Sequence, residues 1–319
     1  MFTSLAPLLF CLMGGWLQDN PVTDCDHDLR SVVISTDVEL VILDVSVKDA
    51  KGGYASNLAA ENFHIYEDKK RQQIKYFSRT EIPVTIGLVI DNSGSMRSKR
   101  PEVVTAALGL VGASNPRDEM FVVNFNDQVS RGLPSGVVFS DDIPTLRKAL
   151  WDGNSEGRTK LYDALGYSLR YLEKGRMDKR TLVVVSDGGD NASILSRKEA
   201  MRGVQESRAT IYTIGIFDES DPDSNSDVLR QLAQLSGGEY FRLRETSEIV
   251  PVCRNIATDI RSRYTIAYVP SRLGSSRSAH LVKVTASAPS GERLLVRTRS
   301  RYMVPTRNQH TLRLKEPGP

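Results

Sequence analysis

The 319-residue sequence has little of several features that mark specialised protein classes. It contains three cysteines, too few for a disulfide-rich secreted scaffold. Its 42 basic and 39 acidic residues are spread through the chain, so the formal charge of +3 gives no strong field to attract nucleic acid or a membrane surface. Beyond the N-terminus, no apolar run reaches the roughly 18 residues of a membrane-spanning helix. The composition is that of an ordinary globular protein, and a prior of roughly 100 to 200 residues per domain predicts two domains.

The N-terminal stretch MFTSLAPLLFCLMGGWLQDN is the one segment hydrophobic enough to need a topological explanation. A short apolar core, then small residues, then polar ones predict an export signal over residues 1–19, although no Lys or Arg precedes the core. Export would place the protein in the periplasm, on the cell surface or in the medium. A buried N-terminal segment is the alternative. Lipid anchoring at Cys11 is disfavoured because Phe10 stands where the lipidation motif has a small residue.

Two cysteines would remain after removal of the signal, Cys25 and Cys253. In an oxidising compartment they can form a disulfide, and they can equally be separate buried thiols. The sequence favours neither alternative, because it does not show whether the two α-carbons come close enough.

The middle of the chain, residues 82–258, alternates strand-like and helix-like segments. Four nearly continuous apolar runs are typical of strands covered on both faces: residues 84–90, 120–125, 181–186 and 210–216. Between the runs, apolar residues recur at helical spacing, as in the stripe of Leu161, Leu165, Leu169 and Leu172. This alternation predicts an α/β fold with a doubly wound, mostly parallel sheet.

The two flanks, residues 30–80 and 262–304, show β-type patterns instead. VILDVSV before the α/β part and YTIAYVP and HLVKVTA after it have the composition and alternation of strands. Each flank holds too few strands to bury a core alone. We therefore expect the flanks to form one smaller antiparallel, sandwich-like β domain into which the α/β domain is inserted, with a tail over residues 305–319.

Polar residues follow the first of the buried strands, in VIDNSGSM (89–96). Asp91, Ser93 and Ser95 alternate, and a sharp bend at Gly94 can direct all three side chains toward one centre. In doubly wound sheets, ligands bind beyond the carboxyl ends of the strands, which is where this turn stands.

Two later segments can supply the same centre. Thr159, in GRTKLYDAL, lies in a loop just before a predicted helix, and Asp187, in VVVSDGGDN, ends another buried strand. The full set is two carboxylates and three hydroxyls, with no sulfur or imidazole. Such oxygen ligands suit a hard divalent ion, Mg²⁺ or Mn²⁺, with Ca²⁺ as a further option.

This pattern resembles the metal-ion-dependent adhesion site (MIDAS) of von Willebrand factor type A (VWFA) domains. The resemblance rests on Asp-x-Ser-x-Ser after a buried strand, then Thr159, then Asp187 in SDGG. It covers about residues 82–258, including LRQLAQLSGGEYF. The flanking stretches LDVSVKDAKGGYASNLAAENFHIYEDKKRQQIKYF and DIRSRYTIAYVPS are similar to a bacterial group of exported VWFA-related proteins described mainly from acidobacteria.

The resemblance implies a role for each site residue. Ser93 and Ser95 would bind the metal directly. Thr159 would bind it directly or through water, and Asp91 and Asp187 mostly through water. The metal would then keep an open position for a Glu or Asp of a partner protein. The sequence identifies neither that partner nor the oligomeric state.

The residues disfavour an enzyme. Aspartyl-phosphate phosphatases need a second Asp where this chain has Ser93, and a serine hydrolase would need Gly-x-Ser-x-Gly at the turn. No histidine lies within residues 82–258 to act as a general base; the four are His27, His64, His280 and His310. We therefore expect a non-enzymatic, metal-dependent protein-binding module. The alternatives are a metal-dependent phosphoester hydrolase and a structural scaffold.

Overall fold

The computed structural model describes residues 40–152, 155–217, 224–243, 245–270 and 279–303. The predicted export signal (1–19), Cys25 and the tail (305–319) lie outside these ranges. Cys253 is a free, buried thiol. None of the helices in the described ranges is both long and apolar enough to cross a membrane.

A six-stranded sheet forms the centre of the α/β part, in the order β10-β9-β8-β5-β6-β7. Its strands are β5 (Val84–Asp91), β6 (Glu119–Phe125), β7 (Val129–Arg131), β8 (Lys179–Ser186), β9 (Thr210–Ile216) and β10 (Tyr240–Leu243). All neighbouring strands are parallel except β6 and β7. Every residue of β5, β6 and β9 is buried, because helices cover both faces of the sheet. The predicted doubly wound, mostly parallel sheet is confirmed.

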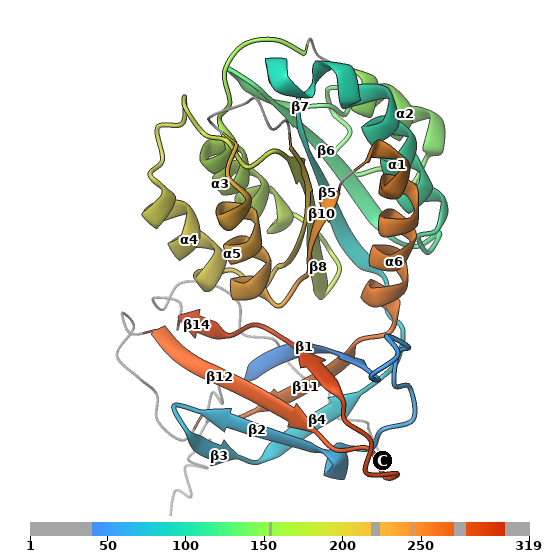
Figure 1. The fold of residues 1–319 in the computed structure, drawn as a ribbon, viewed down its shortest axis with the longest axis vertical. Coiled ribbons are helices and arrows are strands. Elements are labelled where there is room, and N and C mark those ends of the chain that lie inside the picture. The colour runs from blue at the N-terminus through green and yellow to red at the C-terminus, as the bar shows by residue number, and fades with distance from the viewer. Residues whose placement is uncertain (1–39, 153–154, 218–223, 244, 271–278, 304–319) are drawn as a thin grey trace, which may run out of the picture. The chain divides into compact units, whose positions relative to one another are not determined.

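Two groups of helices cover this sheet (Figure 1). One face carries α3 (Leu161–Leu172), α4 (Arg197–Glu206) and α5 (Ser226–Ser236), and the other carries α1 (Arg100–Gly112), α2 (Ile143–Trp151) and α6 (Ile249–Arg261). Local sequence sets their ends. A capping box of Ser196 and Glu199 begins α4, and Gly237, with φ at +81°, ends α5. Because β10, β9, β8, β5 and β6 are parallel neighbours, their carboxyl ends and the loops that follow them lie at the same edge of the sheet.

Two four-stranded antiparallel sheets form the smaller β part, in the orders β13-β1-β11-β4 and β14-β12-β2-β3. From the N-terminal flank come β1 (Val41–Lys48), β2 (Phe63–Glu67), β3 (Lys70–Gln72) and β4 (Ile74–Ser78). From the C-terminal flank come β11 (Tyr264–Tyr268), β12 (Ala279–Ala286), β13 (Leu295–Arg297) and β14 (Arg301–Met303).

Both sheets of the β part combine the two flanks. Leu43 of β1 pairs with Ile266 of β11, and Ile65 of β2 pairs with Val284 of β12. These four side chains belong to one buried core, separate from the core of the α/β part. The expectation that the flanks build a smaller antiparallel β domain together is confirmed.

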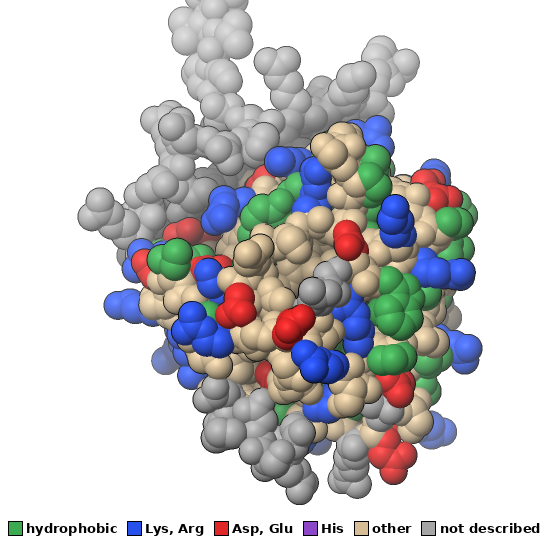
Figure 2. Space-filling model, turned by 90° about the horizontal axis from the view of Figure 1, so that it is seen from above, with side chains coloured by type: hydrophobic (Ala, Val, Ile, Leu, Met, Phe, Trp, Pro, Cys, Tyr) green, Lys and Arg blue, Asp and Glu red, His purple; other side chains and the backbone are tan. Residues whose placement is uncertain are grey.

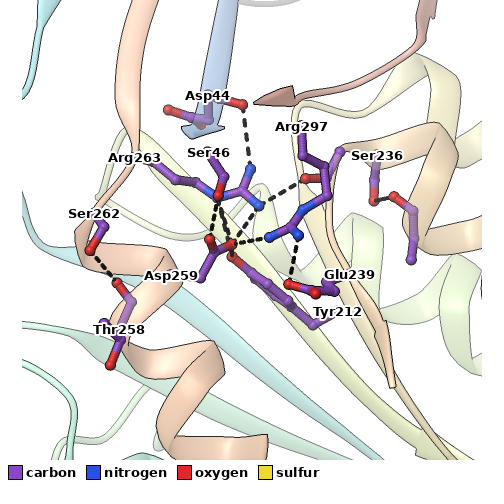
Figure 3. A network of polar contacts seen from close by, with 12 residues as sticks. Asp44, Ser46, Tyr212, Ser236, Glu239, Thr258, Asp259, Ser262, Arg263 and Arg297 are labelled. Carbon is purple, nitrogen blue, oxygen red and sulfur yellow. Dashed lines mark hydrogen bonds and ion pairs between the residues drawn. The ribbon is translucent and has the colours of Figure 1, made fainter. Parts of the chain in front are cut away.

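A buried polar network joins the two parts of the chain (Figure 3). Its centre is Asp259 near the end of α6, whose carboxylate is 2.5 Å from the hydroxyls of Ser46 and Tyr212 and 2.8 Å from Nη2 of both Arg263 and Arg297. Burial raises the pKa of Asp259, but the two guanidinium groups and the two hydroxyl donors outweigh it and hold that pKa well below its usual range. The network is therefore charged at neutral pH, and both oxygens of the Asp259 carboxylate are hydrogen-bonded within it. The buried Arg297 Nε has no hydrogen-bond partner among the described residues.

Candidate metal centre

The first turn of the candidate site follows directly from β5. Asp91 ends the strand and is only 2% exposed. Its Oδ1 accepts a hydrogen bond from the Ser93 backbone N–H at 2.9 Å, an Asx-type turn that reverses the chain into the 3₁₀ segment η2 (Gly94–Lys99). The N–H of Asn92 donates to the Phe125 carbonyl at 2.7 Å and holds the turn against the end of β6. The aspartate thus shapes the turn that presents the serines.

The two serines and Asp187 form one hydrogen-bonded group. The Oγ atoms of Ser93 and Ser95 are 3.2 Å apart, and Ser95 Oγ donates to Asp187 Oδ2 at 2.5 Å. Asp187 directly follows β8, which is the parallel neighbour of β5, and its Oδ1 accepts from the Gly189 N–H at 3.0 Å. Residues 92 positions apart in sequence therefore meet because two adjacent parallel strands end at the same edge.

Thr159 lies in the loop that precedes α3. It is 6% exposed. Its N–H donates to Asn191 Oδ1 at 2.9 Å, and the N–H of Asn191 donates to the Thr159 carbonyl at 3.1 Å. The Gly94 N–H donates to the Gly157 carbonyl at 3.3 Å, which ties this loop to the turn after β5. Within the described ranges, no hydrogen bond joins the Thr159 hydroxyl to the other four candidate residues.

Ser186 is a neighbour of the candidate ligands that sequence reasoning missed. Its Oγ donates to Asp91 Oδ2 at 2.6 Å and accepts from the Gly188 N–H at 3.0 Å. The signal was present in VVVSDGG, where a hydroxyl directly precedes Asp187 at the end of an apolar strand. Ser186 thus links the Asp91 carboxylate to the turn that carries Asp187.

The electrostatics of the site are those of two buried carboxylates without a basic partner. Asp91 and Asp187 are each 2% exposed, and no described lysine or arginine forms an ion pair with either. Burial, together with the negative charge of Asp187, raises the pKa of Asp91 to about 7, against the opposing effect of hydrogen bonds from Ser186 and Ser93. The buried Asn92 Oδ1 also has no hydrogen-bond partner in the described part of the chain. These oxygens fit a hard divalent cation, which would supply the missing positive charge.

The surface around the site carries charges of both signs. Figure 2 views this end of the molecule from above and shows acidic, basic and hydrophobic side chains interspersed, with no large patch of one sign. Arg97 lies 3.9 Å from Glu156, and Arg158 lies 3.5 Å from Asp127, all with exposed side chains. Ile194, in the loop after β8, is 88% exposed.

Comparison with known proteins agrees with this architecture. The family model of the von Willebrand factor type A domain matches residues 85–252. An uncharacterized protein of Synechocystis sp. is 26% identical over 181 residues, which are 55% of this chain and 41% of that protein. This chain thus spans less than half the length of that relative.

The similarities to solved structures come at low sequence identity. A von Willebrand factor type A protein from Catenulispora acidiphila is similar over 83% of this chain and 74% of its own, with 15% identity and a TM-score of 0.50. Proximal thread matrix protein 1 of the mussel byssus, with a zinc-occupied MIDAS motif, is similar over 56% of this chain and 48% of its own, with 18% identity and a TM-score of 0.47. The chain belongs to the von Willebrand factor type A domain family.

Proposed function

We propose that this protein is an exported, non-enzymatic binding module that holds an acidic side chain of a partner protein at a divalent metal ion. The observation that carries the proposal is the hydrogen-bonded group of Ser93, Ser95 and Asp187 beside Asp91. Hydroxyl and carboxylate oxygens from two separate turns gather at the carboxyl ends of β5 and β8, with the Thr159 loop tied to them.

The residues support an ion of the Mg²⁺ type, with Mn²⁺ and Ca²⁺ as the other options. All the candidate ligand atoms are oxygens, and the two carboxylates are buried without a basic partner. When bound, the ion supplies a positive centre with an open position for a carboxylate. Ser93 and Ser95 are proposed as direct ligands and Thr159 as a direct or water-mediated one. Asp91 and Asp187 act mostly through water, while Asp91 also shapes the turn.

The same residues argue against chemistry at this site. A serine nucleophile needs a base within hydrogen-bond reach, and the Ser93 hydroxyl has the Ser95 hydroxyl as its partner. The Ser95 hydroxyl does contact a carboxylate, but no histidine occurs in residues 82–258 to move a proton onward. A site that only binds a partner requires neither a general base nor a histidine.

The proposal includes the organisation of the chain. We take residues 1–19 as the export signal and residues 82–258 as the VWFA domain. Residues 30–80 and 262–304 are taken as one β domain into which the VWFA domain is inserted, supported by the pairing of β1 with β11 and of β2 with β12.

Capture of partners from the native cell envelope tests the function. Wild-type protein, Ser93→Ala and Ser114→Ala would each be used as bait, with Mg²⁺ and again with chelator. Ser114 is the matched control, because its Oγ caps the end of α1 by bonding the Leu110 carbonyl, before β6 begins. We expect Mg²⁺-dependent bands with wild type and Ser114→Ala, and none with Ser93→Ala.

Two outcomes would replace the proposal with its alternatives. If the purified protein turned over a phosphate ester such as p-nitrophenyl phosphate, and Asp91→Ala abolished this turnover, the protein would be a hydrolase. If wild type and Ser114→Ala captured nothing in a Mg²⁺-dependent way, the scaffold interpretation would stand.

A further inference from the structure

A second group of candidate metal ligands lies in the β part, in a region that the proposed function does not use. It consists of Glu67 at the end of β2, Asp68 in the turn to β3, and His280 near the start of β12. One carboxylate oxygen of each acid and one ring nitrogen of the histidine all lie within 4.8 Å of one another. We call these three residues the Glu67–Asp68–His280 group.

The strand pattern turns two of the three side chains inward. Buried and exposed residues alternate along β12, so His280 faces the same side as Val282 and Val284. Glu67 likewise continues the inward row of β2 after Ile65. Glu67 is 5% and His280 is 8% exposed. The two polar residues therefore occupy positions that the rest of each strand fills with apolar side chains.

Asp68 is held in place by β12. Its φ is +47°, in the left-handed region, and its backbone N–H donates to the Leu281 carbonyl at 2.9 Å. Its Oδ1 accepts from the Leu281 N–H at 3.0 Å, which leaves Oδ2 directed at His280 Nδ1, 2.8 Å away. The turn between β2 and β3 thus brings a second carboxylate to the histidine.

The charges in this group do not balance. Glu67 Oε2 accepts hydrogen bonds from the hydroxyls of Tyr268 at 2.6 Å and Tyr302 at 2.8 Å. Both phenols are donors to Glu67 and supply no positive charge. In the described ranges, no lysine or arginine forms an ion pair with Glu67 or Asp68. His280 offers at most one positive charge against two carboxylates, of which Glu67 is buried and Asp68 is 49% exposed.

One ring nitrogen of His280 has no hydrogen-bond partner among the described residues. This atom, Nε2, is buried. Its ring stacks on Tyr302, with centroids 5.3 Å apart, which fixes the plane of the imidazole. Asp68 Oδ2 faces Nδ1, the other ring nitrogen, so Nδ1 is the atom that an ion shared with Asp68 would use. The buried Glu67 carboxylate beside this imidazole has no cation in the part of the chain that the structure describes, which is costly to the fold unless another group supplies the positive charge.

We propose that Glu67, Asp68 and His280 bind a divalent transition-metal ion of the Zn²⁺ class. One imidazole nitrogen with two carboxylate oxygens is a donor set suited to Zn²⁺, unlike the oxygen-only set of the VWFA domain. The two tyrosine hydroxyls on Glu67 Oε2 would orient that carboxylate, as outer hydrogen bonds do for metal ligands. Metal–ligand distances of about 2.1 Å would place tetrahedral ligand atoms roughly 3.4 Å apart. The 2.8 Å contact between Asp68 Oδ2 and His280 Nδ1 would open to that distance, and a pair of ligand atoms as far apart as 4.8 Å would close to it.

The ion would act as a structural clamp between the two flanks. Its ligands come from residues 67–68 and from His280, on opposite sides of the VWFA domain in the sequence. Because the unfolded chain does not hold these ligands together, the free energy of metal binding would stabilise the folded β part. The simpler alternative is an ion pair of protonated His280 with Asp68 alone. That pair would hold the turn against β12 but would leave Glu67 without a cation.

Zinc binding to the full chain tests the proposal. Chelator-treated wild type, Asp68→Asn, His280→Gln and His64→Gln would be titrated with Zn²⁺. Bound metal would be measured by equilibrium dialysis with elemental analysis, and Tm would be measured with and without Zn²⁺. His64→Gln is the matched control, because His64 lies on β2 opposite Thr285, outside the group. Asn at position 68 tolerates a positive φ and retains a carbonyl oxygen for the Leu281 N–H.

We expect wild type and His64→Gln to bind one more equivalent of Zn²⁺ than Asp68→Asn and His280→Gln, or to bind it at least tenfold more tightly. We also expect Zn²⁺ to raise the Tm of the first pair more than that of the second. If His280→Gln does not fold, Asp68→Asn carries the test alone. Equal Zn²⁺ binding by all four proteins would overturn the proposal and leave only the Asp68–His280 ion pair. Failure of Mg²⁺-dependent partner capture would not bear on this result.

Discussion

Arg263 and Asp259 form a buried ion pair across one helical turn, with Arg263 Nη2 2.8 Å from Asp259 Oδ2 at the point where α6 gives way to β11. Their side chains are 3% and 1% exposed. Arg297 of β13 reaches the same Oδ2 at 2.8 Å, and Ser46 of β1 donates to Oδ1 (Figure 3). The last helix of the VWFA domain is thereby bonded to both flanks of the chain.

Removing the charge of Asp259 should destabilise the whole protein. Asp259→Asn leaves the buried Arg263 and the partly buried Arg297 beside a neutral amide. The expected loss in the free energy of unfolding is about 3–5 kcal/mol. Urea denaturation followed by circular dichroism measures it. Asp227→Asn is the control, because its ion pair with Arg230 is exposed and should be worth less than about 1 kcal/mol. Similar losses in the two variants would show that burial of the network adds nothing.

The contribution of Asp259 should depend on pH in a defined direction. Its pKa is well below the usual range in the folded protein, so its stabilising effect is present above the unfolded-state pKa of about 3.9 and is lost as the pH falls toward the folded-state value. The stability difference between wild type and Asp259→Asn should be constant above about pH 5 and shrink below about pH 4. Denaturation curves at pH 7, 5, 4 and 3 test this. A difference that grows on acidification would contradict the assignment.

Loss of the Ser95 hydroxyl should weaken metal binding without unfolding the protein. Ser95→Ala removes one proposed ligand and the hydrogen bond to Asp187 Oδ2. We expect Mg²⁺ affinity, measured by isothermal titration calorimetry, to fall at least tenfold, about 1.4 kcal/mol. Thr105→Ala, on the exposed face of α1, should leave the affinity unchanged. An unaltered Kd for Ser95→Ala would remove this serine from the site.

Gly188 should be the glycine next to the site that tolerates no side chain. Its φ is +79°, and a Cβ would lie 2.2 Å from the Asn225 carbonyl oxygen, directly after Asp187. Gly188→Ala should therefore lower both stability and Mg²⁺ affinity. Gly136→Ala measures the destabilisation caused by the positive φ alone, because φ is +85° there and nothing lies within 4 Å of the added carbon. We expect a loss of about 1 kcal/mol for Gly136→Ala and a clearly larger one for Gly188→Ala. Equal losses of stability in the two variants would mean that the loop after β8 can shift to make room for the added carbon.

The Cys253 thiol should be unreactive in the folded protein. Burial raises its pKa to about 12, so almost no thiolate is present at pH 8. Iodoacetamide at pH 8, followed by mass spectrometry of the peptide that contains Cys253, should show modification only after denaturant is added. Rapid labelling of the native protein would contradict the buried placement in α6.

The parts of this molecule that could be predicted from sequence depend on neighbours in the chain. Long apolar runs such as 84–90 indicated strands covered on both faces, and β5 is buried at every position. The spacing of Asp91, Ser93 and Ser95 indicated a shared turn, and one hydrogen bond from Ser93 to Asp91 forms that turn. Alternation in the flanks indicated strands. Each flank held too few of them to bury a core alone.

Other features required residues far apart to be brought together. In the sequence, Ser186 is only a hydroxyl at the end of a predicted strand. The parallel pairing of β5 and β8 in the structure places it against Asp91. Nothing in the local patterns around Asp259, Arg263 and Arg297 showed that one carboxylate would hold both guanidinium groups. These contacts depend on how helices and strands pack, which local spacing does not describe.

The sequence by itself determined the α/β class, the β character of the flanks and the identity of the candidate metal ligands, because these follow from periodicity and from residue types within single segments. Only the tertiary structure decided that the flanks share both sheets and that Asp259 bonds to both of them. It also decided that Glu67, Asp68 and His280 meet where the turn between β2 and β3 lies against β12. The physical reason is that strand pairing and burial act across the chain, and they bring together polar groups that lie 212 and 213 residues apart in the sequence.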